Sequence, residues 1–394
     1  MRLRRLPPVY SPLRLGALWA GVQALGGAGD AREAVIAWIR ASFDPRLAIL
    51  TDSGTTALTL AIRAAQRIHP GPVSLPAYCC YDLATAADGA GADVLLYDLD
   101  PHTLGPDWNS FESTLRRGAS AVVVAHLYGH PVDVHQAQAL ADSAGSILIE
   151  DAAQGVGARY DGHPLGSFGG MAILSFGRGK GLTGGGGGAL LFHSDELVDA
   201  AMDAAAITDA PPKSGLAQLG KTLAQWALAR PSLYAIPASV PFLGLGETVY
   251  RRPGKPAPMS RSSAAILSQS IPDIREEANR RRVNAARLAT VVGLSEAARL
   301  YKRAPLAASG DLRMPVHAQA ERLGEWRSAR ASGLGIAPGY PRALSDLEGF
   351  GRIGNPEMGF PGARELSHRL HTLPTHGMLS DNDLEALEEW LQSL

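Results

Sequence analysis

The chain has 394 residues, a formal net charge of -1 and 46% hydrophobic residues, a globular composition with enough apolar material for a large core. The near-zero charge, without a basic stripe or zinc-finger spacing, disfavours nucleic acid as a partner. The only two cysteines, Cys79 and Cys80, are adjacent, so they form neither a metal-ligand spacing nor a disulfide framework. We therefore expect no metal site and a reducing, cytoplasmic location.

The N-terminal region combines a basic head with a mildly apolar middle, as a signal peptide does. Three prolines, Arg14 and Gln23 interrupt this stretch, which disfavours secretion. Asp30 and Glu33 then have the spacing of a capping box. This spacing predicts that an amphipathic helix begins here.

Short β-rich runs alternate with helical stretches in the first half of the chain. The runs are almost continuously apolar, as expected for a parallel sheet that helices cover on both faces. They occupy residues 47–51, 73–75, 94–100, 121–127, 147–151, 172–176 and 189–192. The pattern predicts a large α/β domain with a mostly parallel central sheet and flanking helices.

The pattern changes after about residue 205, where helices and proline-broken apolar stretches dominate. The uncharged stretch 231–246 contains three prolines and is shorter than the roughly 18–20 residues of a spanning helix, so we expect no transmembrane segment. It is interpreted as buried or facing a dimer partner, with membrane-surface contact as the alternative. The run YRRPGKPAP at 250–258 indicates a domain crossing, which predicts domains at 1–250 and 251–394.

Three elements are predicted in the C-terminal part. A helix is expected over 275–288 and a strand over 311–317. The SDND run at 380–383 resembles a capping pattern and opens the last helix. This mixture predicts a smaller α+β domain.

Polar residues follow several of the predicted strands, at the edge where open α/β sheets bind ligands. After the first strand, Gly54, Thr55 and Thr56 open a helix and supply free N–H groups, close backbone approach and two hydroxyls. These features suit a phosphate group. Because Ser and Thr caps open many helices, the same residues also fit a purely structural cap.

A carboxylate emerges from another buried strand in ILIEDAAQ. The strand ends at Glu150 and Asp151, and Gln154 follows three residues later. A buried carboxylate needs a partner, because burying its charge alone is costly. A ligand with a basic ring nitrogen would be such a partner, and a structural ion pair or a helix cap is the alternative.

A lone lysine, Lys180, stands among glycines in SFGRGKGLTGGGGG. Walker A is excluded, because Leu174 stands where that motif needs its first glycine and Gly181 where it needs Ser or Thr. A lysine on a thin loop beside a sheet can serve as a nucleophile, whereas the glycines alone could merely supply turns. A phosphate cradle, an acidic partner and a Schiff-base lysine together meet the requirements for binding pyridoxal 5′-phosphate.

The same residues resemble the DegT/DnrJ/EryC1/StrS aminotransferases, which are fold-type-I pyridoxal-phosphate enzymes of sugar-nucleotide and antibiotic-sugar pathways. The similarity follows the family's order over nearly the whole chain. The matching segments are SGTTAL (53–58), LPAY (75–78), DLDPHTLGPD (98–107), HLYGHPVD (126–133), EDAAQGVGA (150–158), GSFG (166–169), SFGRGK with the following glycines (175–188) and the C-terminal segment 360–385.

The resemblance implies a role for each matched residue. Lys180 corresponds to the Schiff-base lysine, Asp151 to the partner of the protonated pyridine nitrogen, and Gln154 to a contact near the phenolic oxygen of the cofactor. The residues that correspond to phosphate ligands are Gly54, Thr55, Thr56 and Ser175. The family also implies a homodimer in which each subunit completes the active site of the other.

The chain departs from the family pattern at two places. Cys80 occupies the position where many members place an aromatic residue over the cofactor ring, so stacking is either absent or supplied by Tyr78 or Tyr81. The stretch 255–266 lacks the asparagine that members bring across the dimer, and Lys255 or Arg261 is the alternative. By contrast, Lys180 argues against the dehydratase branch, which has histidine at this position.

The substrate pocket is expected to include Tyr78, His126, Tyr128 and His376, although a histidine at a strand end or turn is more often structural. The resemblance implies that the amino group moves from L-glutamate to a keto group of a nucleotide-linked sugar by a ping-pong mechanism. The alternatives are a keto-cyclitol or another secondary-metabolite precursor as the acceptor, or a regulator of the same fold without turnover.

Overall fold

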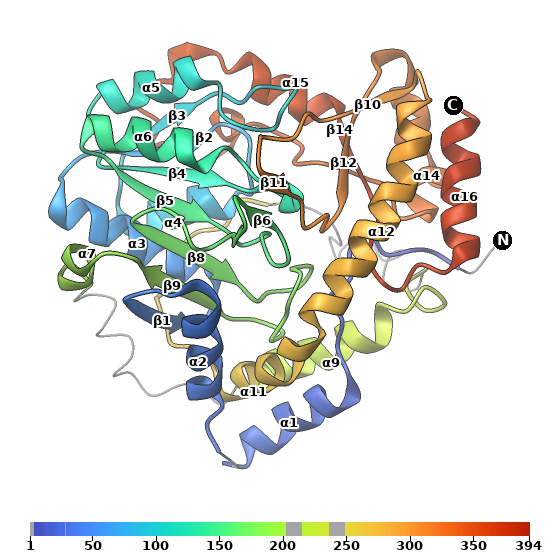
Figure 1. Ribbon diagram of the computed structural model, residues 1–394, viewed down its shortest axis with the longest axis horizontal. Coiled ribbons are helices and arrows are strands. Elements are labelled where there is room, and N and C mark those ends of the chain that lie inside the picture. Colours follow the sequence, from blue (N-terminus) through green and yellow to red (C-terminus); the bar gives the residue numbers. More distant parts are fainter. Residues whose placement is uncertain (1–3, 28, 202–214, 236–248) are drawn as a thin grey trace.

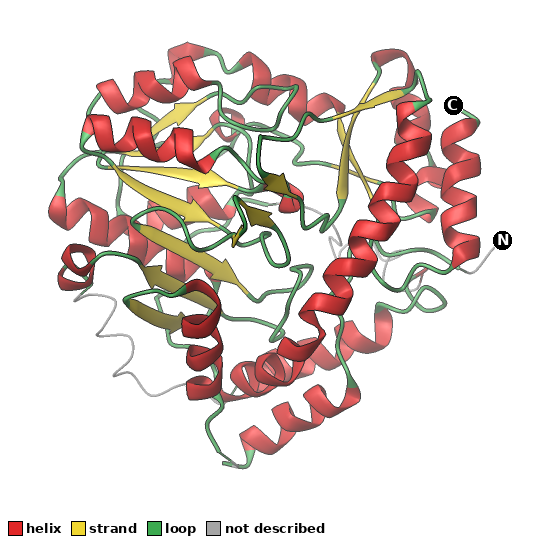
Figure 2. Ribbon diagram, in the orientation of Figure 1, coloured by secondary structure: helices red, strands yellow, loops and turns green. Residues whose placement is uncertain are grey.

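The computed structural model describes residues 4–27, 29–201, 215–235 and 249–394. A seven-stranded sheet forms the centre of the larger part, and helices lie on both of its faces (Figure 1, Figure 2). In chain order its strands are β1 (Leu47–Thr51), β2 (Val73–Pro76), β3 (Val94–Tyr97), β4 (Ala121–Ala125), β5 (Ile147–Asp151), β8 (Met171–Ser175) and β9 (Gly188–Phe192). All seven overlap the predicted runs.

The spatial order of this sheet is β1-β9-β8-β5-β4-β2-β3. The pairs from β8 to β3 are parallel, whereas β9 is antiparallel to both β8 and β1. The predicted mostly parallel sheet is therefore confirmed, with β9 as the reversed strand. Because β1 and β8 are both antiparallel to β9, β1 runs parallel to β8 and therefore also to β5.

Helices surround the sheet and build the C-terminal part. They are α1 (Leu15–Leu25), α2 (Arg32–Phe43), α3 (Gly54–Ile68), α4 (Asp82–Ala90), α5 (Trp108–Arg116), α6 (Val134–Ala144), α7 (Asp195–Asp199), α9 (Leu216–Leu228), α11 (Arg261–Ser270), α12 (Ile274–Gly293), α13 (Leu323–Trp326), α14 (Ala329–Gly333), α15 (Pro361–Arg369) and α16 (Asp381–Gln392). Among these described helices, none has both the length and the hydropathy needed to span a membrane.

Two smaller antiparallel sheets complete the fold. One has the order β10-β12-β14-β13 and packs beside α12 and α16, and the other has the order β11-β6-β7 (Figure 1). Their strands are β6 (Arg159–Tyr160), β7 (His163–Pro164), β10 (Ala298–Leu300), β11 (Ala307–Ala308), β12 (Met314–Ala318), β13 (Ala337–Pro338) and β14 (Leu370–Leu373). The smaller α+β part is thus present.

Alternate residues of the central strands enter separate hydrophobic cores. On β4, Val123 packs in the core beneath α3 and α4, whereas Val122 and Val124 pack in the core that includes α2, α5 and α6. Because both faces of the sheet are buried, every position along such a strand favours an apolar residue. This double burial explains the continuous apolar runs of the sequence.

Two capping predictions had different outcomes. The pattern at Asp30 and Glu33 is not a capping box, because the N-cap of α2 is Ala31 and the Asp30 carboxylate binds the main-chain and side-chain nitrogens of Arg32. The pattern that precedes α16 is confirmed, since the Ser380 hydroxyl accepts from the Asp383 N–H and the Asp383 carboxylate accepts from the Ser380 N–H.

In the C-terminal part, the predicted helix is close to the observed one, whereas the predicted strand starts three residues too early. The helix expected at 275–288 lies within α12, which begins one residue earlier and continues to Gly293. The strand expected at 311–317 begins only at Met314, since Asp311 adopts a left-handed backbone conformation with φ of 44°.

The chain returns to the large sheet after the expected crossing at 250–258. The Asp52 N–H donates to the carbonyl of Ala257, and Ala264 and Leu267 of α11 pack in one core with α2 and the sheet. The division at residue 250 stays a prediction. Most of the apolar segment 231–246 lies outside the described residues, so its predicted burial stays a prediction as well.

Candidate active site

The predicted polar residues gather at one edge of the central sheet. Because β1, β8 and β5 are parallel, their carboxyl ends lie at the same edge. Ser175 ends β8, Asp151 ends β5, and α3 starts three residues after the end of β1. This edge is where α/β sheets bind their ligands.

The start of α3 approaches the end of β8 very closely. A Cβ added to Gly54 would lie 2.8 Å from the Cβ of Ser175, so this position requires glycine. The N-cap residue Ser53 accepts from the N–H of Thr56 at 3.1 Å, and the Thr56 hydroxyl donates to Asp52 at 2.6 Å. The N–H groups of Gly54 and Thr55 have no acceptor within the helix and suit an anion.

Asp151 is a buried carboxylic acid with 8% of its surface exposed. Its Oδ1 accepts from the Ala153 N–H at 3.0 Å, and among the described residues no basic group lies within 4 Å. Burial raises the pKa of Asp151, which the Ala153 hydrogen bond and the charge of Lys180 partly oppose. A cationic ligand group at this carboxylate would supply the missing partner.

Lys180 lies on the loop between β8 and β9, and neighbouring segments hold this loop on two sides. The buried Ser11 hydroxyl donates to the Lys180 carbonyl at 2.6 Å. Gly179, which precedes the lysine, has a φ of 73°, and a Cβ there would meet the Val9 side chain at 3.0 Å. The N-terminal segment therefore fixes the backbone that carries the lysine.

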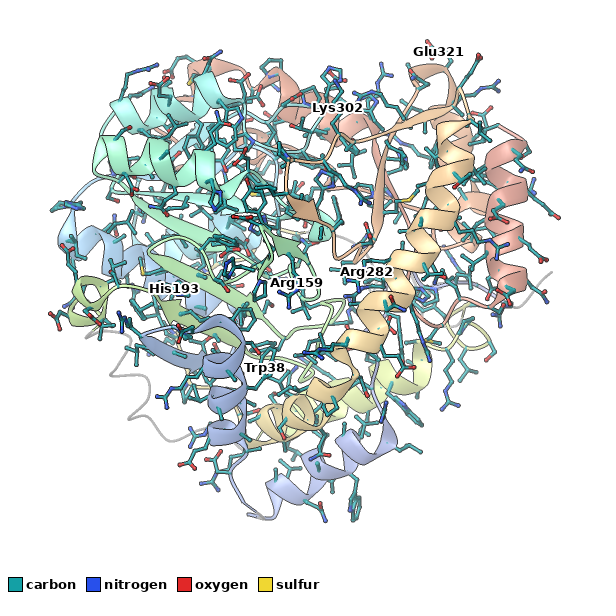
Figure 3. All side chains as sticks on the ribbon, in the orientation of Figure 1. Trp38, Arg159, His193, Arg282, Lys302 and Glu321 are labelled. Atoms are coloured by element: carbon teal, nitrogen blue, oxygen red, sulfur yellow. The ribbon has the colours of Figure 1, made fainter. Side chains whose placement is uncertain are left out.

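The long helix α12 holds the other side of the lysine loop. Arg281 is almost fully buried and donates to the carbonyls of Gly310 and Val156 at 3.0 and 2.9 Å. A Cβ on Gly181 would lie 3.1 Å from the Arg281 Nη1, so the arginine lies directly against the loop. Its neighbour Arg282 donates to Gly157 at 3.3 Å, and Figure 3 shows it on the same helix.

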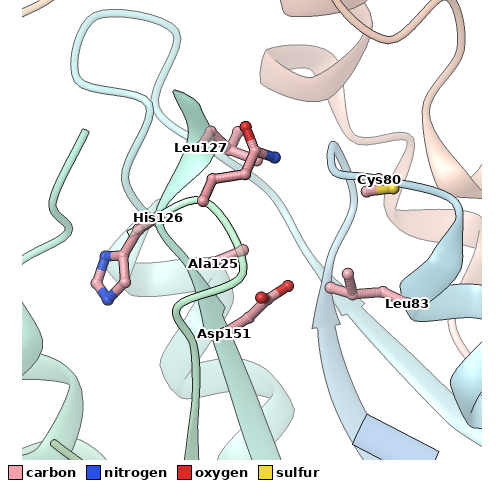
Figure 4. A pocket seen from close by; sticks show the side chains of 7 residues that line it. Cys80, Leu83, Ala125, His126, Leu127 and Asp151 are labelled. Atoms are coloured by element: carbon pink, nitrogen blue, oxygen red, sulfur yellow. The ribbon is translucent and has the colours of Figure 1, made fainter. Parts of the chain in front are cut away.

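Cys80 lines a pocket together with Asp151 and Gln154, and Figure 4 shows the cysteine and aspartate side chains on facing segments. Burial raises the pKa of the Cys80 thiol to about 12, and the charge of Lys180 opposes part of this rise. The thiol therefore stays protonated at neutral pH. A protonated thiol is a poor nucleophile, which excludes Cys80 as the attacking group.

The amide of Gln154 is bonded at both ends. Its Oε1 accepts from the Tyr128 N–H at 3.0 Å, and its Nε2 donates to the Tyr340 hydroxyl at 2.9 Å. Tyr128 has a φ of 59°, a left-handed conformation that is unfavourable for a tyrosine and typical of functional sites. The bonded Gln154 amide helps to hold this turn in place.

Tyr340 is a site residue that sequence analysis missed. Its ring stacks on Tyr128 with centroids 5.9 Å apart, and its N–H donates to the Tyr78 hydroxyl at 2.8 Å. The Tyr81 hydroxyl accepts from the Arg342 N–H at 2.9 Å. Tyr78 and Tyr81, the predicted candidates for ring stacking, thus position the segment that carries Tyr340.

Both predicted pocket histidines have protein partners. The His126 Nδ1 accepts from the Val132 N–H at 3.1 Å, so its Nε2 carries the proton and donates to Glu150 at 3.0 Å. The His376 Nε2 donates to the Pro7 carbonyl at 2.9 Å, and burial lowers the pKa of His376 to about 4. His126 lines the pocket and His376 lies apart from it, so their roles in substrate binding stay predictions.

The sequence profile of the DegT/DnrJ/EryC1/StrS aminotransferase family matches residues 33–392. The chain belongs to this family. Curated relatives include an L-glutamine:2-deoxy-scyllo-inosose aminotransferase from Streptomyces kanamyceticus, 34% identical over 43% of this chain and 41% of the relative. A GDP-perosamine synthase from Caulobacter vibrioides is 36% identical over 38% of this chain and 40% of that protein. The matches thus span about two fifths of these relatives.

Solved structures share the whole fold. A sugar aminotransferase from Micromonospora echinospora superposes with a TM-score of 0.77 at 21% identity, covering 98% of this chain and 99% of that one. The predicted fold-type-I architecture is therefore confirmed.

Aminotransferases of this family use pyridoxal 5′-phosphate. The described residues fit that cofactor, because the buried Asp151 forms no ion pair with a described residue and the start of α3 offers a phosphate N–H groups that have no acceptor within the helix. Lys180 lies near enough for its charge to act on both Asp151 and Cys80. The assignments of individual residues to the cofactor remain proposals.

Proposed function

We propose that the protein is an aminotransferase that moves the amino group of L-glutamate to a keto group of a nucleotide-linked sugar. The observation that carries the proposal is the buried Asp151 carboxyl at the same sheet edge as Lys180 and the close Gly54–Ser175 contact. This combination suits a cofactor with a protonated ring nitrogen, an aldehyde and a phosphate. Membership of a sugar aminotransferase family supports the reaction class.

Each residue has a physical role in this proposal. The bound cofactor would supply a conjugated ring that withdraws electrons from the reacting carbon. Asp151 would keep the ring nitrogen protonated, and the N–H groups of Gly54 and Thr55 would bind the phosphate. Lys180 Nζ would remove the proton from the carbon that bears the amino group of the donor. Gln154, held by Tyr128 and Tyr340, would orient the ring.

The donor half of the reaction is testable without an acceptor. We expect the absorbance band of the lysine-bound cofactor to bleach when L-glutamate is added to the loaded protein. L-Glutamine and L-alanine serve as comparison donors. If glutamate leaves the band unchanged, glutamate is refuted as the donor. If only glutamine bleaches the band, glutamine is the donor.

A keto-cyclitol is the second candidate acceptor, because a relative of 34% identity is an aminotransferase of 2-deoxy-scyllo-inosose. The GDP-perosamine synthase match favours a nucleotide-linked acceptor at similar identity, 36%. A panel of keto-cyclitols and keto-sugar nucleotides, offered to the glutamate-treated protein, separates the two acceptors by which one restores the absorbance band.

We further propose that the protein is a homodimer, since α1 and α9 contact each other and each leaves large apolar side chains exposed. Trp19 is 61% exposed and Leu216 is 67% exposed, although both are large apolar side chains. On the same helix α9, Thr222 packs directly against Gly185 in the glycine run after Lys180. A second copy on this surface would therefore lie near the active site. Lys255 and Arg261 stay predictions as residues that cross between subunits.

Replacing Trp19 with glutamate is expected to dissociate the dimer, because a charge at the centre of an apolar interface is costly to bury. Light scattering should give half the mass of the unsubstituted protein. The matched control is Gln136→Glu, which adds the same charge at an exposed position of α6, far from α1 and α9 (Figure 1). A Trp19→Glu protein of unchanged mass would place the interface elsewhere.

A further inference from the structure

The N-terminal segment, residues 4–11, is attached to the C-terminal part of the fold before it reaches the lysine loop. The Leu6 N–H donates to the carbonyl of Gly333 at 2.9 Å, and the His376 Nε2 donates to the carbonyl of Pro7 at 2.9 Å. Gly333 ends α14, and His376 follows β14. The segment therefore leaves the C-terminal part from a fixed position.

Two side chains of the segment strengthen this attachment. The Arg4 Nε donates at 3.0 Å to the carboxylate of Asp383, which lies in the first turn of α16. The Tyr10 and His376 rings meet edge to face, with their centroids 6.1 Å apart. His376, which the sequence predicted for the substrate pocket, thus contacts the N-terminal segment through both its Nε2 and its ring.

The other end of the segment bonds the main chain of Lys180. Ser11 is fully buried, and its hydroxyl donates to the Lys180 carbonyl at 2.6 Å. In the described part of the chain no other donor bonds this carbonyl. Because a hydrogen bond is directional, this contact fixes where the lysine backbone lies.

Packing beside Ser11 restrains the residue before the lysine. Gly179 has a left-handed backbone, and a Cβ there would lie 3.0 Å from the Cγ1 of Val9. A lysine amine is carried on a flexible four-carbon stem, so its reach depends on where the backbone is held. Reactions between held groups slow sharply when one group is displaced by about 1 Å. The contacts of Val9 and Ser11 therefore bear on the placement of the Lys180 amine.

We infer that Ser11 is a positioning residue that places the Lys180 amine at the aldehyde of the cofactor. This inference rests on the proposed role of Lys180 and adds a residue of the N-terminal segment to the site. In the step concerned, the Lys180 Nζ condenses with the aldehyde, a C=N bond forms and one water is released. The Ser11 hydroxyl bonds the main chain rather than the amine, so Ser11 acts through the lysine.

Two forms of the cofactor, titrated into cofactor-free Ser11→Ala protein, test the inference. Pyridoxal 5′-phosphate carries the aldehyde that bonds Lys180, whereas pyridoxamine 5′-phosphate carries an amine at that position and forms no such bond. We expect the affinity for pyridoxal 5′-phosphate to fall about tenfold, the size of one lost hydrogen bond, and the affinity for pyridoxamine 5′-phosphate to stay unchanged. A general loosening of the site would weaken the binding of both forms alike.

Further variants make the result specific. Ser270→Ala removes the hydroxyl of another buried serine, which donates to the Ile266 carbonyl at 2.9 Å, and should keep both affinities. In a Lys180→Ala background, Ser11→Ala should cause no further loss, because no amine remains to be placed. If Ser11→Ala does not fold, Ser11→Cys keeps a side chain of similar size with a weaker donor and should also lower the affinity for the aldehyde form alone.

An equal loss of affinity for both forms of the cofactor would show that Ser11 only stabilises the fold. An unchanged affinity for pyridoxal 5′-phosphate in the serine variants, or a further loss in the Lys180→Ala background, would also contradict the inference. If glutamate fails to bleach the unsubstituted protein while Ser11→Ala loses affinity for the aldehyde form alone, the proposed donor is refuted and the role of Ser11 stands.

Discussion

Replacing Lys180 with alanine is expected to abolish amino transfer. The variant loses the amine that bonds the cofactor and moves the substrate proton, and proton transfer by a positioned side chain alone contributes about 10²- to 10⁴-fold. The Ser11 hydrogen bond should survive, because it binds the main-chain carbonyl of residue 180. Single-turnover measurement of product from glutamate-treated protein checks this expectation.

Two comparisons make the Lys180 result specific. Lys302→Ala removes an exposed lysine at the molecular surface (Figure 3) and should leave turnover unchanged. Added methylamine should restore part of the activity of Lys180→Ala, because a free amine can carry the proton that the side chain no longer carries. Full turnover of Lys180→Ala without added amine would refute the assignment of the lysine.

The strands could be predicted because burial on both faces makes each one a continuous apolar run. The direction of β9 could not be predicted from its residues, since GALLF fits a parallel or an antiparallel strand equally well. The signal lay in the connection: no helix separates β8 from β9, and a parallel pair needs a crossover. The reversal makes the Lys180 loop a direct connection between adjacent antiparallel strands.

The position of the candidate site could also be predicted from the sequence. Asp151, Gly54 and Ser175 end or follow strands whose carboxyl ends lie at the same edge of the sheet. Tyr340 and Ser11 could not be found in this way. Tyr340 follows β13 in an irregular segment, and Ser11 precedes α1, so neither has a periodic pattern. Their contacts with Gln154 and Lys180 join residues far apart in the chain, and only the folded structure reveals such contacts.

The cap at Asp30 shows a different limit of local patterns. Asp30 and Glu33 have the sequence spacing of a capping box, but Arg32 lies closer to Asp30 and carries a charge opposite to that of the Asp30 carboxylate. The carboxylate therefore binds the guanidinium group and the N–H of Arg32. At Ser380 the capping box forms, although the Asp383 carboxylate also accepts from the Arg4 guanidinium group.

Replacing Asp151 with asparagine is expected to lower amino transfer by about 10²- to 10³-fold, the usual loss when a preorganised electrostatic partner is removed. Asparagine can still accept the Ala153 N–H through its Oδ1, so the fold should be kept. It cannot hold a ring nitrogen in the protonated state, because its amide carries no negative charge. Titration of the cofactor-free variant with pyridoxal 5′-phosphate should also show weaker binding.

The same substitution should stabilise the cofactor-free protein at neutral pH. Burial raises the pKa of Asp151, so between the unfolded and folded pKa values the native state holds more protons than the unfolded state. Native stability therefore falls as pH rises through that window, and Asp151→Asn removes this fall. Thermal unfolding at several pH values measures it, with the exposed Asp93→Asn as control. A variant that is less stable than the unsubstituted protein at every pH would show that the carboxylate is already satisfied without a ligand. A higher melting temperature with lost activity would instead show that the protein keeps a destabilising buried charge for its reaction.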